Sequence, residues 1–393
     1  MNEFFFLYSA CTIFAAYKNS DKTTTMFMQF AQRLRHNKSA SKLVDKVFHA
    51  CPSLAAYLLK VKKSRDALRE GLQLIDKGMD LPEGASREGF IEANRTQHMN
   101  LSEYLYQYNL YQKTKAEREE FLSYVDYHAL VLKLRMKYPE HDHMELLKDK
   151  EKFLRFATSL GLCHRRWLYA PESTFEEFAD LLSSSDCIMK PHDTSWGIGI
   201  YKVNKQEGPQ VRELYDKCVK ELTVVEECIT GYHVTQAFHP ASLNTVRVMT
   251  VSYNGRALLF GGMLRVGCGG TVVDNTHAGG LYAQIDINTG IIESDGIDTE
   301  GKHHLCHPDS KIQFKGFPIP FWDKITALCL NAAPKVKHFF IGWDIAILEN
   351  GDLEVIEANS RPDFDGLQTP LHKGMKRTLY NQLKELMGDD FKE

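Results

Sequence analysis

Two carboxylates and an amide near the C-terminus are spaced as ligands for a divalent cation. Asp344 lies in an apolar run at 340–348, Glu357 lies in a second run at 353–358, and Asn359 follows. If the runs pair as antiparallel strands, the two acids face each other, which destabilises a hairpin unless a cation lies between them. Carboxylate and amide oxygens suit Mg²⁺. A solvent-facing acidic pair is the alternative, but strongly apolar strands favour a buried metal site.

The pairing of the two acids depends on a predicted turn. Asn350-Gly351 separates the apolar runs, and Asn-Gly between strands is the strongest short-range signal for a two-residue hairpin turn. Such a turn places Glu349 opposite Asp352, so the numbers of paired residues sum to 701. The two acids also meet this sum, which predicts Cβ atoms about 5 Å apart. The amide two residues further on shares their face.

A lysine and a glycine-rich loop form a second feature, within IMKPHDTSWGIGIYKV at residues 188–203. Lys190 ends a predicted strand and is followed by Ser195, Gly197 and Gly199, then by another strand. Glycines let backbone N–H groups approach phosphate oxygens, and a lysine supplies the countercharge. The loop lacks the GKS or GKT of a Walker A motif, and no helix follows it as in a Rossmann fingerprint. Taken alone, such a loop is more often a plain turn than a phosphate-binding loop.

Three further features carry little weight separately. Lys150 opens an amphipathic helix, and Glu226 and Glu227 end an apolar strand. Charged residues in such places commonly face solvent. Asp274 and Asn275 begin a Gly-rich loop that either lines an acceptor pocket or forms a polar turn.

Cysteine and histidine chemistry is disfavoured. His304 and His307 have zinc-like spacing, but no second ligand pair stands near them in the sequence. Cys268 lies in a Gly-rich stretch where no partnering histidine can be placed. We predict neither a zinc site nor a cysteine nucleophile.

Composition excludes several classes of protein. The chain has 393 residues with a net charge of -3, which gives no basis for binding nucleic acid or an anionic membrane. Nine scattered cysteines without a CxxC pair indicate a reduced, cytoplasmic location. The apolar run Phe4–Tyr17 has 14 residues, short of the roughly 20 needed to span a bilayer. We interpret it as a buried helix, with a membrane-surface contact or signal remnant as the alternative.

The elements that must position these residues change in type along the chain. Residues 1–140 have helical periodicity and few Gly or Pro, which predicts a helical N-terminal region. After it, predicted strands lie at 187–191, 199–203, 222–229, 245–253, 257–264, 340–348 and 353–358. Predicted helices lie at about 149–160, 174–184, 209–220, 322–333 and 373–387.

In this order, the features resemble the ATP-grasp superfamily, and most closely the sugar-transfer-associated ATP-grasp family of polysaccharide gene clusters. The resemblance covers roughly residues 90–385 and is carried by SLNTVRVMT, VDNTHAGGLYAQIDINTG, HP with GFPIPFW, and IGWDIAIL with VIEANSRPDFDG. It implies an α+β fold, in which two lobes with antiparallel sheets sandwich ATP and the helical region precedes them in the sequence. The implied lobes are residues 141–231 and 232–393.

The resemblance also implies roles for single residues. ATP phosphates would be contacted by Lys150, Lys190 and the loop from Ser195 through Gly197 to Gly199, with Lys190 near the adenine as well. The adenine would be held by the stretch Glu226, Glu227, Cys228 and Ile229, with Glu226 accepting from its amino group. Arg247 and Arg265 would lie near the transferring phosphoryl group, and one or two Mg²⁺ ions would be held by Asp344, Glu357 and Asn359.

Two departures from the family pattern limit what it implies. The ribose-binding glutamate is missing, because Tyr232 and His233 follow Gly231. The usual α/β domain before the lobes is replaced by helices, so the acceptor is not implied. In addition, a two-residue turn at Asn254-Gly255 would put the two arginines on opposite faces of their hairpin. They reach one site only if Gly261-Gly262 hosts a bulge.

The expected function is a Mg-ATP-dependent ligase. It would activate a carboxylate as an acyl phosphate for attack by an amine or similar nucleophile, in polysaccharide or secondary-metabolite biosynthesis. The partners would be a small-molecule acceptor and a nucleophilic co-substrate, with Arg361 available for a carboxylate. A kinase that phosphorylates a hydroxyl, with Asp274 or His277 as base, is the alternative. A non-catalytic nucleotide-binding protein is the second alternative. The sequence leaves the oligomeric state open.

Overall fold

The computed structural model describes residues 52–194, 198–271, 274 and 278–391. The apolar run Phe4–Tyr17 therefore lies outside the described residues. The chain divides into two compact units, one of residues 1–141 and 372–377, the other of residues 142–371 and 378–393. Within the described ranges, no helix is both long and apolar enough to cross a membrane.

The first unit is helical in its described part. Phe90, Tyr104, Tyr108 and Phe121 are the large buried side chains of its core. Hydroxyl side chains accept backbone N–H groups at three helix starts, at Ser86, Thr114 and Ser123. Its elements are α4 (Pro52–Asp76), α5 (Arg87–Gln97), η1 (Glu103–Gln107), η2 (Leu110–Gln112), α6 (Lys115–Glu119), α7 (Tyr124–Lys137) and η3 (Pro139–His141).

The smaller sheet of the second unit is antiparallel, with strand order β1-β4-β2-β3. Its strands are β1 (Trp167–Tyr169), β2 (Cys187–Pro191), β3 (Tyr201–Val203) and β4 (Thr223–Glu227). Helices α10 (Phe175–Ser184) and α11 (Gln210–Lys220) share a core with Cys187, Met189 and Val225. Because side chains alternate along a strand, Lys190 and Glu226 project from the opposite face of this sheet.

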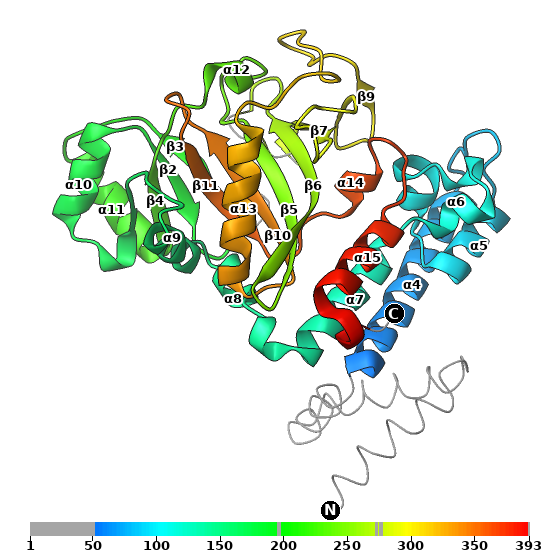
Figure 1. Ribbon diagram of the computed structural model, residues 1–393. Helices are drawn as coiled ribbons and strands as arrows, with labels where there is room; N and C mark the ends of the chain where they lie inside the picture. The colour runs from blue at the N-terminus through cyan, green and yellow to red at the C-terminus, as the bar shows by residue number, and fades with distance from the viewer. Residues whose placement is uncertain (1–51, 195–197, 272–273, 275–277, 392–393) are drawn as a thin grey trace, which may run out of the picture. The chain divides into compact units, whose positions relative to one another are not determined.

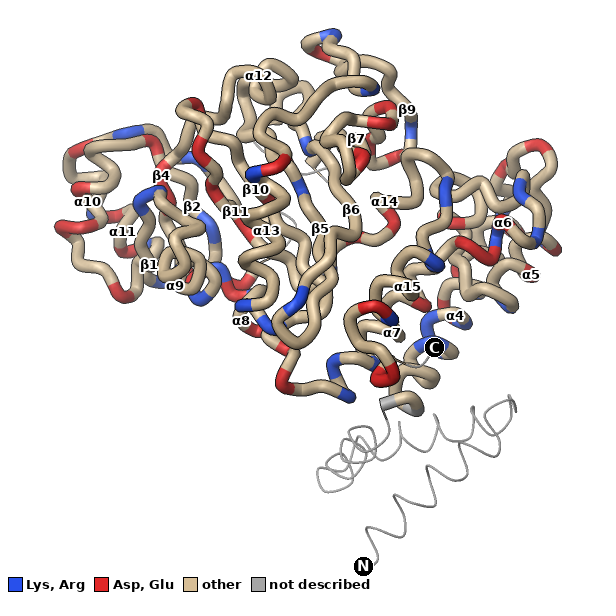
Figure 2. Tube along the Cα trace, viewed as in Figure 1, with Lys and Arg blue, Asp and Glu red and all other residues tan. Residues whose placement is uncertain are grey.

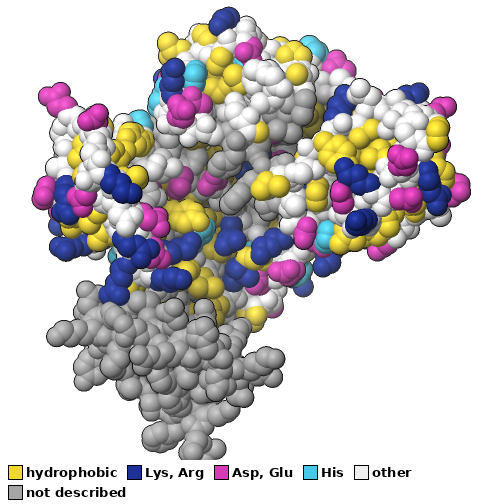
Figure 3. Space-filling view, turned by 180° about the vertical axis from the view of Figure 1, so that it is seen from behind, with side chains coloured by type: hydrophobic (Ala, Val, Ile, Leu, Met, Phe, Trp, Pro, Cys, Tyr) yellow, Lys and Arg dark blue, Asp and Glu magenta, His cyan; other side chains and the backbone are white. Residues whose placement is uncertain are grey.

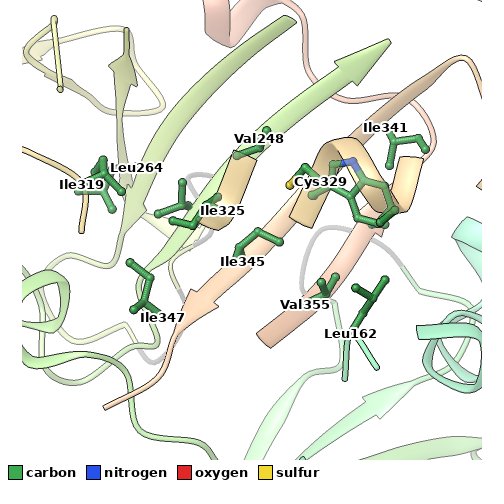
Figure 4. Packing of buried hydrophobic residues seen from close by; sticks show 14 of the residues in the cluster. Leu162, Val248, Leu264, Ile319, Ile325, Cys329, Ile341, Ile345, Ile347 and Val355 are labelled. Atoms are coloured by element: carbon green, nitrogen blue, oxygen red, sulfur yellow. The ribbon is translucent and has the colours of Figure 1, made fainter. Parts of the chain in front are cut away.

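The larger sheet has seven antiparallel strands in the order β11-β10-β5-β6-β7-β8-β9 (Figure 1). They are β5 (Thr245–Tyr253), β6 (Arg256–Val266), β7 (Leu281–Ile285), β8 (Gly296–Ile297), β9 (His303–His304), β10 (Phe340–Ile347) and β11 (Leu353–Asn359). Helix α13 (Trp322–Val336) lies over one face, where Ile325 and Cys329 pack with Val248, Ile345 and Val355 (Figure 4). This buried side leaves the opposite face of the sheet for polar residues.

Shorter elements connect and flank the two sheets of this unit. Asp149 caps helix α9 by accepting from the backbone N–H of Lys152 at 3.2 Å. The flanking elements are α8 (Met144–Lys148), α9 (Lys150–Ser159), η4 (Ala170–Glu172), α12 (His233–Gln236), α14 (Asp365–Gln368), α15 (Lys376–Met387) and η6 (Gly388–Asp390).

The hairpin of β10 and β11 confirms one prediction and corrects another. Asp344 lies opposite Glu357 as predicted. The prediction of a two-residue turn is wrong, because Leu348 rather than Glu349 pairs with Asp352. Gly351, in the loop, adopts a φ of +82°. The loop thus has three residues, which shifts the register by one. A β-bulge between the positions opposite Asp344 and Ile345 shifts it back.

The hairpin of β5 and β6 has its predicted two-residue turn, with Tyr253 opposite Arg256. The predicted bulge is also present, although it lies at Phe260, one residue before Gly261. Beyond it, Arg265 pairs with Thr245, which shares a strand face with Arg247. Both arginines therefore project from the same face of the sheet, opposite α13.

Candidate nucleotide and metal site

The face of the larger sheet opposite α13 carries its polar residues in rows that cross the strands. One row runs across successive strands through Glu357, Asp344, Arg247, the apolar Met263 and Gln284, each directly opposite the next. The next row includes Thr245, Arg265 and Tyr282. Few charged residues occur along β5, β6 and β10 (Figure 2). Their charges are therefore concentrated in these rows.

Asp344 is the centre of this array of charged side chains. Arg247 Nε and Nη2 donate to its two carboxylate oxygens at 2.6 Å each, and Arg265 Nη1 donates to Oδ2 at 2.9 Å. The residue is 4% exposed. Burial alone would raise the pKa of the Asp344 carboxyl, but the two guanidinium groups outweigh burial and lower it. Both arginines predicted to lie near the phosphoryl group thus meet at one carboxylate.

Glu357 and Asn359 join the same cluster. The hydrogen-bonding pattern orients the Asn359 amide so that its oxygen accepts from Arg247 Nη2 at 3.1 Å. Its nitrogen then donates to Glu357 Oε1 at 3.0 Å. The three residues predicted to bind metal therefore offer only oxygen donors, from two carboxylates and one amide. This donor set fits Mg²⁺ rather than a softer metal.

Asp274 lies on the far side of Arg265. Arg265 Nη2 is 3.5 Å from Asp274 Oδ1, and the hydroxyl of Thr245 donates to Oδ2. Burial raises the pKa of the Asp274 carboxyl, and Arg265 offsets that rise only in part. The other candidate residues of this loop, Asn275 and His277, lie outside the described residues.

Lys150 lies at the start of α9, beside the glycine-rich loop. Its Nζ donates to the carbonyls of Pro191, at 3.1 Å, and of Thr194. Burial lowers the pKa of Lys150, and the negative charge of Glu357 opposes that change. Gly199 adopts a φ of +75°, which favours glycine. The predicted phosphate-loop residues Ser195 and Gly197 lie outside the described residues.

Lys190 and Glu226 are joined by an ion pair. Lys190 Nζ is 2.8 Å from Glu226 Oε1, and Arg165 Nε donates to Oε2 at 2.6 Å. Burial would raise the pKa of the Glu226 carboxyl, but Arg165 and Lys190 lower it to about 2. Each oxygen expected to accept from an adenine amino group therefore already accepts from a cation.

A cavity of about 250 Å³ lies beside this ion pair. Its walls come from both sheets of the unit, because Glu226 is on β4 and Ile356 is on β11. The backbone N–H of Cys228 donates to Asp186 O at 2.8 Å. The backbone N–H of Ile229 donates to no backbone carbonyl among the described residues. The cavity is lined by residues including Arg165, Ile188, Lys190, Glu226, Glu227, Cys228, Ile229, Thr230, Gly231, Gln236 and Ile356.

Two groups of candidate residues do not join the array. Arg361 is exposed. Ligand atoms of Cys268, His307 and Asp309 lie within 4.8 Å of one another. However, His307 Nδ1 accepts the backbone N–H groups of Asp309 and Ser310 at 3.3 Å. These are the contacts of a turn, and His307 Nε2 donates to Gly267 O at 2.8 Å, so both ring nitrogens already have hydrogen-bond partners.

Sequence reasoning missed two buried members of the site. Arg165 and Glu354 have side chains only 1% and 0% exposed, and Arg165 Nη1 donates to Glu354 Oε1 at 2.7 Å. Glu354 could have been noticed as an acid inside an apolar strand. Arg165 offers no such pattern, because an exposed arginine follows it directly in the sequence.

Comparison with known proteins identifies the family. Residues 131–384 match the family described as sugar-transfer-associated ATP-grasp, and the chain belongs to that family. Its fold is therefore the predicted α+β ATP-grasp fold, with two antiparallel sheets, and a helical N-terminal region precedes it in the sequence. Comparison with curated proteins gave no match.

Several solved structures of ligases are similar to this chain. They include ATP-grasp ligase PsnB with a minimal precursor, at 16% identity over 62% of each chain and a TM-score of 0.39. D-alanyl-alanine synthetase A from Vibrio cholerae is 12% identical over 65% of this chain and 71% of its own, with a TM-score of 0.41. L-amino acid ligase from Bacillus licheniformis is 16% identical over 63% and 50%, with a TM-score of 0.38. Identities and TM-scores as low as these do not indicate which substrate this chain uses.

Proposed function

We propose that this chain is a Mg-ATP-dependent ligase that activates a substrate carboxylate as an acyl phosphate. The observation that carries the proposal is the convergence of Asp344, Glu357 and Asn359 with two arginines on one sheet face. Ile356, directly before Glu357, lines the cavity that contains Lys190 and Glu226. A nucleotide base in that cavity would direct its phosphates toward the carboxylates.

Each polar residue then has a distinct task. Lys150 and Lys190 neutralise phosphate oxygens, and the amide of Ile229 meets the edge of the base. Asp344, Glu357 and Asn359 would hold Mg²⁺, which when bound neutralises charge on the triphosphate and aligns it. Arg247 and Arg265 exchange part of their contact with Asp344 for the transferring phosphoryl group, which suits a guanidinium fork.

The reaction needs little acid–base chemistry from the protein. A carboxylate is ionised at neutral pH, so its oxygen attacks the γ-phosphorus without a base while the bond to ADP breaks. An amine or similar nucleophile then attacks the acyl carbon, and phosphate leaves with the former carboxylate oxygen. Positioning and charge stabilisation supply most of the catalysis in phosphoryl transfer. We assign the reaction to polysaccharide or secondary-metabolite biosynthesis, of which the family's association with sugar transfer supports the first.

A kinase is the second candidate, and one observation favours it. A hydroxyl acceptor needs a base within reach. Asp274 is a carboxylate whose pKa is raised by burial, and it lies 3.5 Å from Arg265. Asp274 could therefore take a proton from a hydroxyl held beside the arginine.

Trapping with hydroxylamine separates the two candidates. The protein is incubated with ATP, Mg²⁺, a panel of amino acids and sugar acids, and hydroxylamine, which converts acyl phosphates to hydroxamates. The ligase gives a hydroxamate together with equimolar ADP and phosphate. A stable phosphorylated acceptor without free phosphate or hydroxamate would reject the ligase in favour of the kinase.

A further inference from the structure

The guanidinium of Arg165 joins the smaller sheet to the edge of the larger one. It lies between two buried carboxylates, with Nε donating to Glu226 Oε2 at 2.6 Å and Nη1 donating to Glu354 Oε1 at 2.7 Å. It also donates to two backbone carbonyls, those of Val355 at 3.0 Å and Ile356 at 3.2 Å. The arginine therefore contacts the cavity wall and β11 together.

The two carbonyls belong to the β-bulge of β11. In a regular strand, successive carbonyls point in opposite directions, yet here both accept from one guanidinium. Ile345 pairs with Val355 and Asp344 pairs with Glu357, so Ile356 is the extra residue. Without the bulge, Ile356 would lie opposite Asp344, and Glu357 would turn to the face that packs against α13.

The chain around Arg165 also completes the edge of the sheet. β11 is an edge strand, which leaves backbone groups without strand partners. Val355 N donates to Leu162 O at 2.9 Å. The backbone N–H groups of His164 and Arg165 donate to the Glu354 carboxylate at 3.0 and 3.2 Å. The segment before β1 thus holds β11 by several contacts, of which Arg165 alone reaches the bulge carbonyls.

We infer that Arg165 is a positioning residue that stabilises the β11 bulge and thereby keeps Glu357 on the metal-binding face. This inference rests on the proposed function, because it assigns Glu357 to Mg²⁺. It also connects the cavity to the metal ligands, since the same guanidinium contacts Glu226. A change at Arg165 therefore alters metal binding although Arg165 itself is not a metal ligand.

The test is calorimetric titration of ADP into the full chain at a series of Mg²⁺ concentrations. Arg165→Lys keeps the charge for Glu226 and Glu354 but lacks the fork that reaches both carbonyls. Because Arg165 also lines the cavity, the variant is judged by its Mg²⁺ dependence rather than by its Mg²⁺-free ADP affinity: we expect the Mg²⁺ concentration for half-maximal enhancement of ADP binding to rise about tenfold or more. Arg166→Lys is the matched control, because this neighbouring side chain is exposed and pairs with Asp180. It should behave as wild type.

A second variant guards against loss of folding. Deletion of Ile356 removes the extra residue and leaves Glu357 opposite Asp344 without a bulge. Loss of Ile356 from the cavity wall alters ADP affinity itself, so the quantity compared is the Mg²⁺ concentration for half-maximal enhancement. That concentration should stay at the wild-type value in the deletion variant, and it should return to that value when the deletion is combined with Arg165→Lys. Arg165→Lys with unchanged Mg²⁺ dependence overturns the inference, and so does a deletion variant that still binds ADP without Mg²⁺ but has lost the Mg²⁺ dependence. A wild-type protein that shows no Mg²⁺-enhanced nucleotide binding would instead reject the proposed function.

Discussion

Asp344 and Glu357 face each other across one hairpin but have different surroundings. Asp344 is buried and shared by two arginines, whereas Glu357 is half-buried and accepts from the Asn359 amide. Removing a charge from a buried ion-pair network leaves its partners uncompensated. The same conservative substitution should therefore affect folding at one position and metal binding alone at the other.

We predict that Glu357→Gln abolishes Mg²⁺-dependent ADP binding while the free energy of unfolding stays within about 0.5 kcal/mol of wild type. Asp344→Asn should also abolish it, but should lower the free energy of unfolding by about 3–5 kcal/mol. Calorimetry and urea unfolding measure the two quantities. Wild-type Mg²⁺ dependence in either variant would remove that residue from the metal site.

Lys190 provides a second prediction at this scale. Each charge-assisted hydrogen bond to a phosphate is worth about 1.5–3 kcal/mol. Lys190→Ala should therefore weaken ATP binding roughly ten- to a hundredfold. Lys152→Ala is the control, because the Lys152 side chain is 57% exposed and pairs with Asp149. Equal affinity of both variants for ATP, measured by calorimetry, would exclude Lys190 from the nucleotide site.

At the scale of elements, the hairpin of β10 and β11 shows what a sequence pattern can predict. The facing acids were identified correctly, but the predicted two-residue turn is a three-residue loop and the bulge was not foreseen. The two errors cancel at Asp344 and Glu357. The bulge could not be read from the sequence, because the contacts that stabilise it come from Arg165, almost 200 residues earlier in the chain.

The junction before β7 gives a prediction for the loop that carries Asp274. A Cβ atom at Gly280 would lie 2.7 Å from the backbone oxygens of Asp274 and Val266. Since backbone atoms cannot move aside as a flexible side chain can, Gly280→Ala should lower the free energy of unfolding by about 1–3 kcal/mol. At Gly270 a Cβ atom meets nothing within 4 Å. Urea unfolding should show Gly270→Ala within about 0.5 kcal/mol of wild type, and equal values for the two variants would contradict this packing.

At the scale of the second unit, the predicted long elements match the structure. The strands at 187–191 and 245–253 have the predicted bounds. Four strands were missed. The strands β1, β8 and β9 have only two or three residues, which carry no detectable periodicity, and the five-residue strand β7 was missed as well. Arg165 and Glu354 were missed for a related reason. Their importance depends on the two sheets coming together, which local patterns do not encode.

The buried ions joining the two sheets predict sensitivity to acid. The pKa of Glu226 is about 2 in the folded chain, below its ordinary 4.5. The resulting stabilisation is present above the ordinary value and is lost as pH falls from 4.5 toward 2. At about 1.4 kcal/mol per unit, it amounts to roughly 3 kcal/mol. The pKa of Asp344 is also lowered in the folded chain, so its protonation likewise reduces stability as the pH falls.

Urea unfolding between about pH 6 and pH 3 measures this effect. Wild-type stability should fall steeply over that range. Glu226→Gln should start less stable and fall less steeply, because its side chain does not titrate. Parallel curves for the two proteins would show that Glu226 is not the titrating group.

The most direct test of carboxylate activation follows an oxygen atom. A carboxylic acid identified by hydroxamate formation is labelled with ¹⁸O in its carboxyl group and incubated with the protein, ATP, Mg²⁺ and hydroxylamine. Mass spectrometry of the released phosphate then reports the origin of its oxygens. We predict that each phosphate carries one ¹⁸O atom, because it leaves with the former carboxylate oxygen. Phosphate without label, or label retained in a phosphorylated acceptor, would contradict activation as an acyl phosphate.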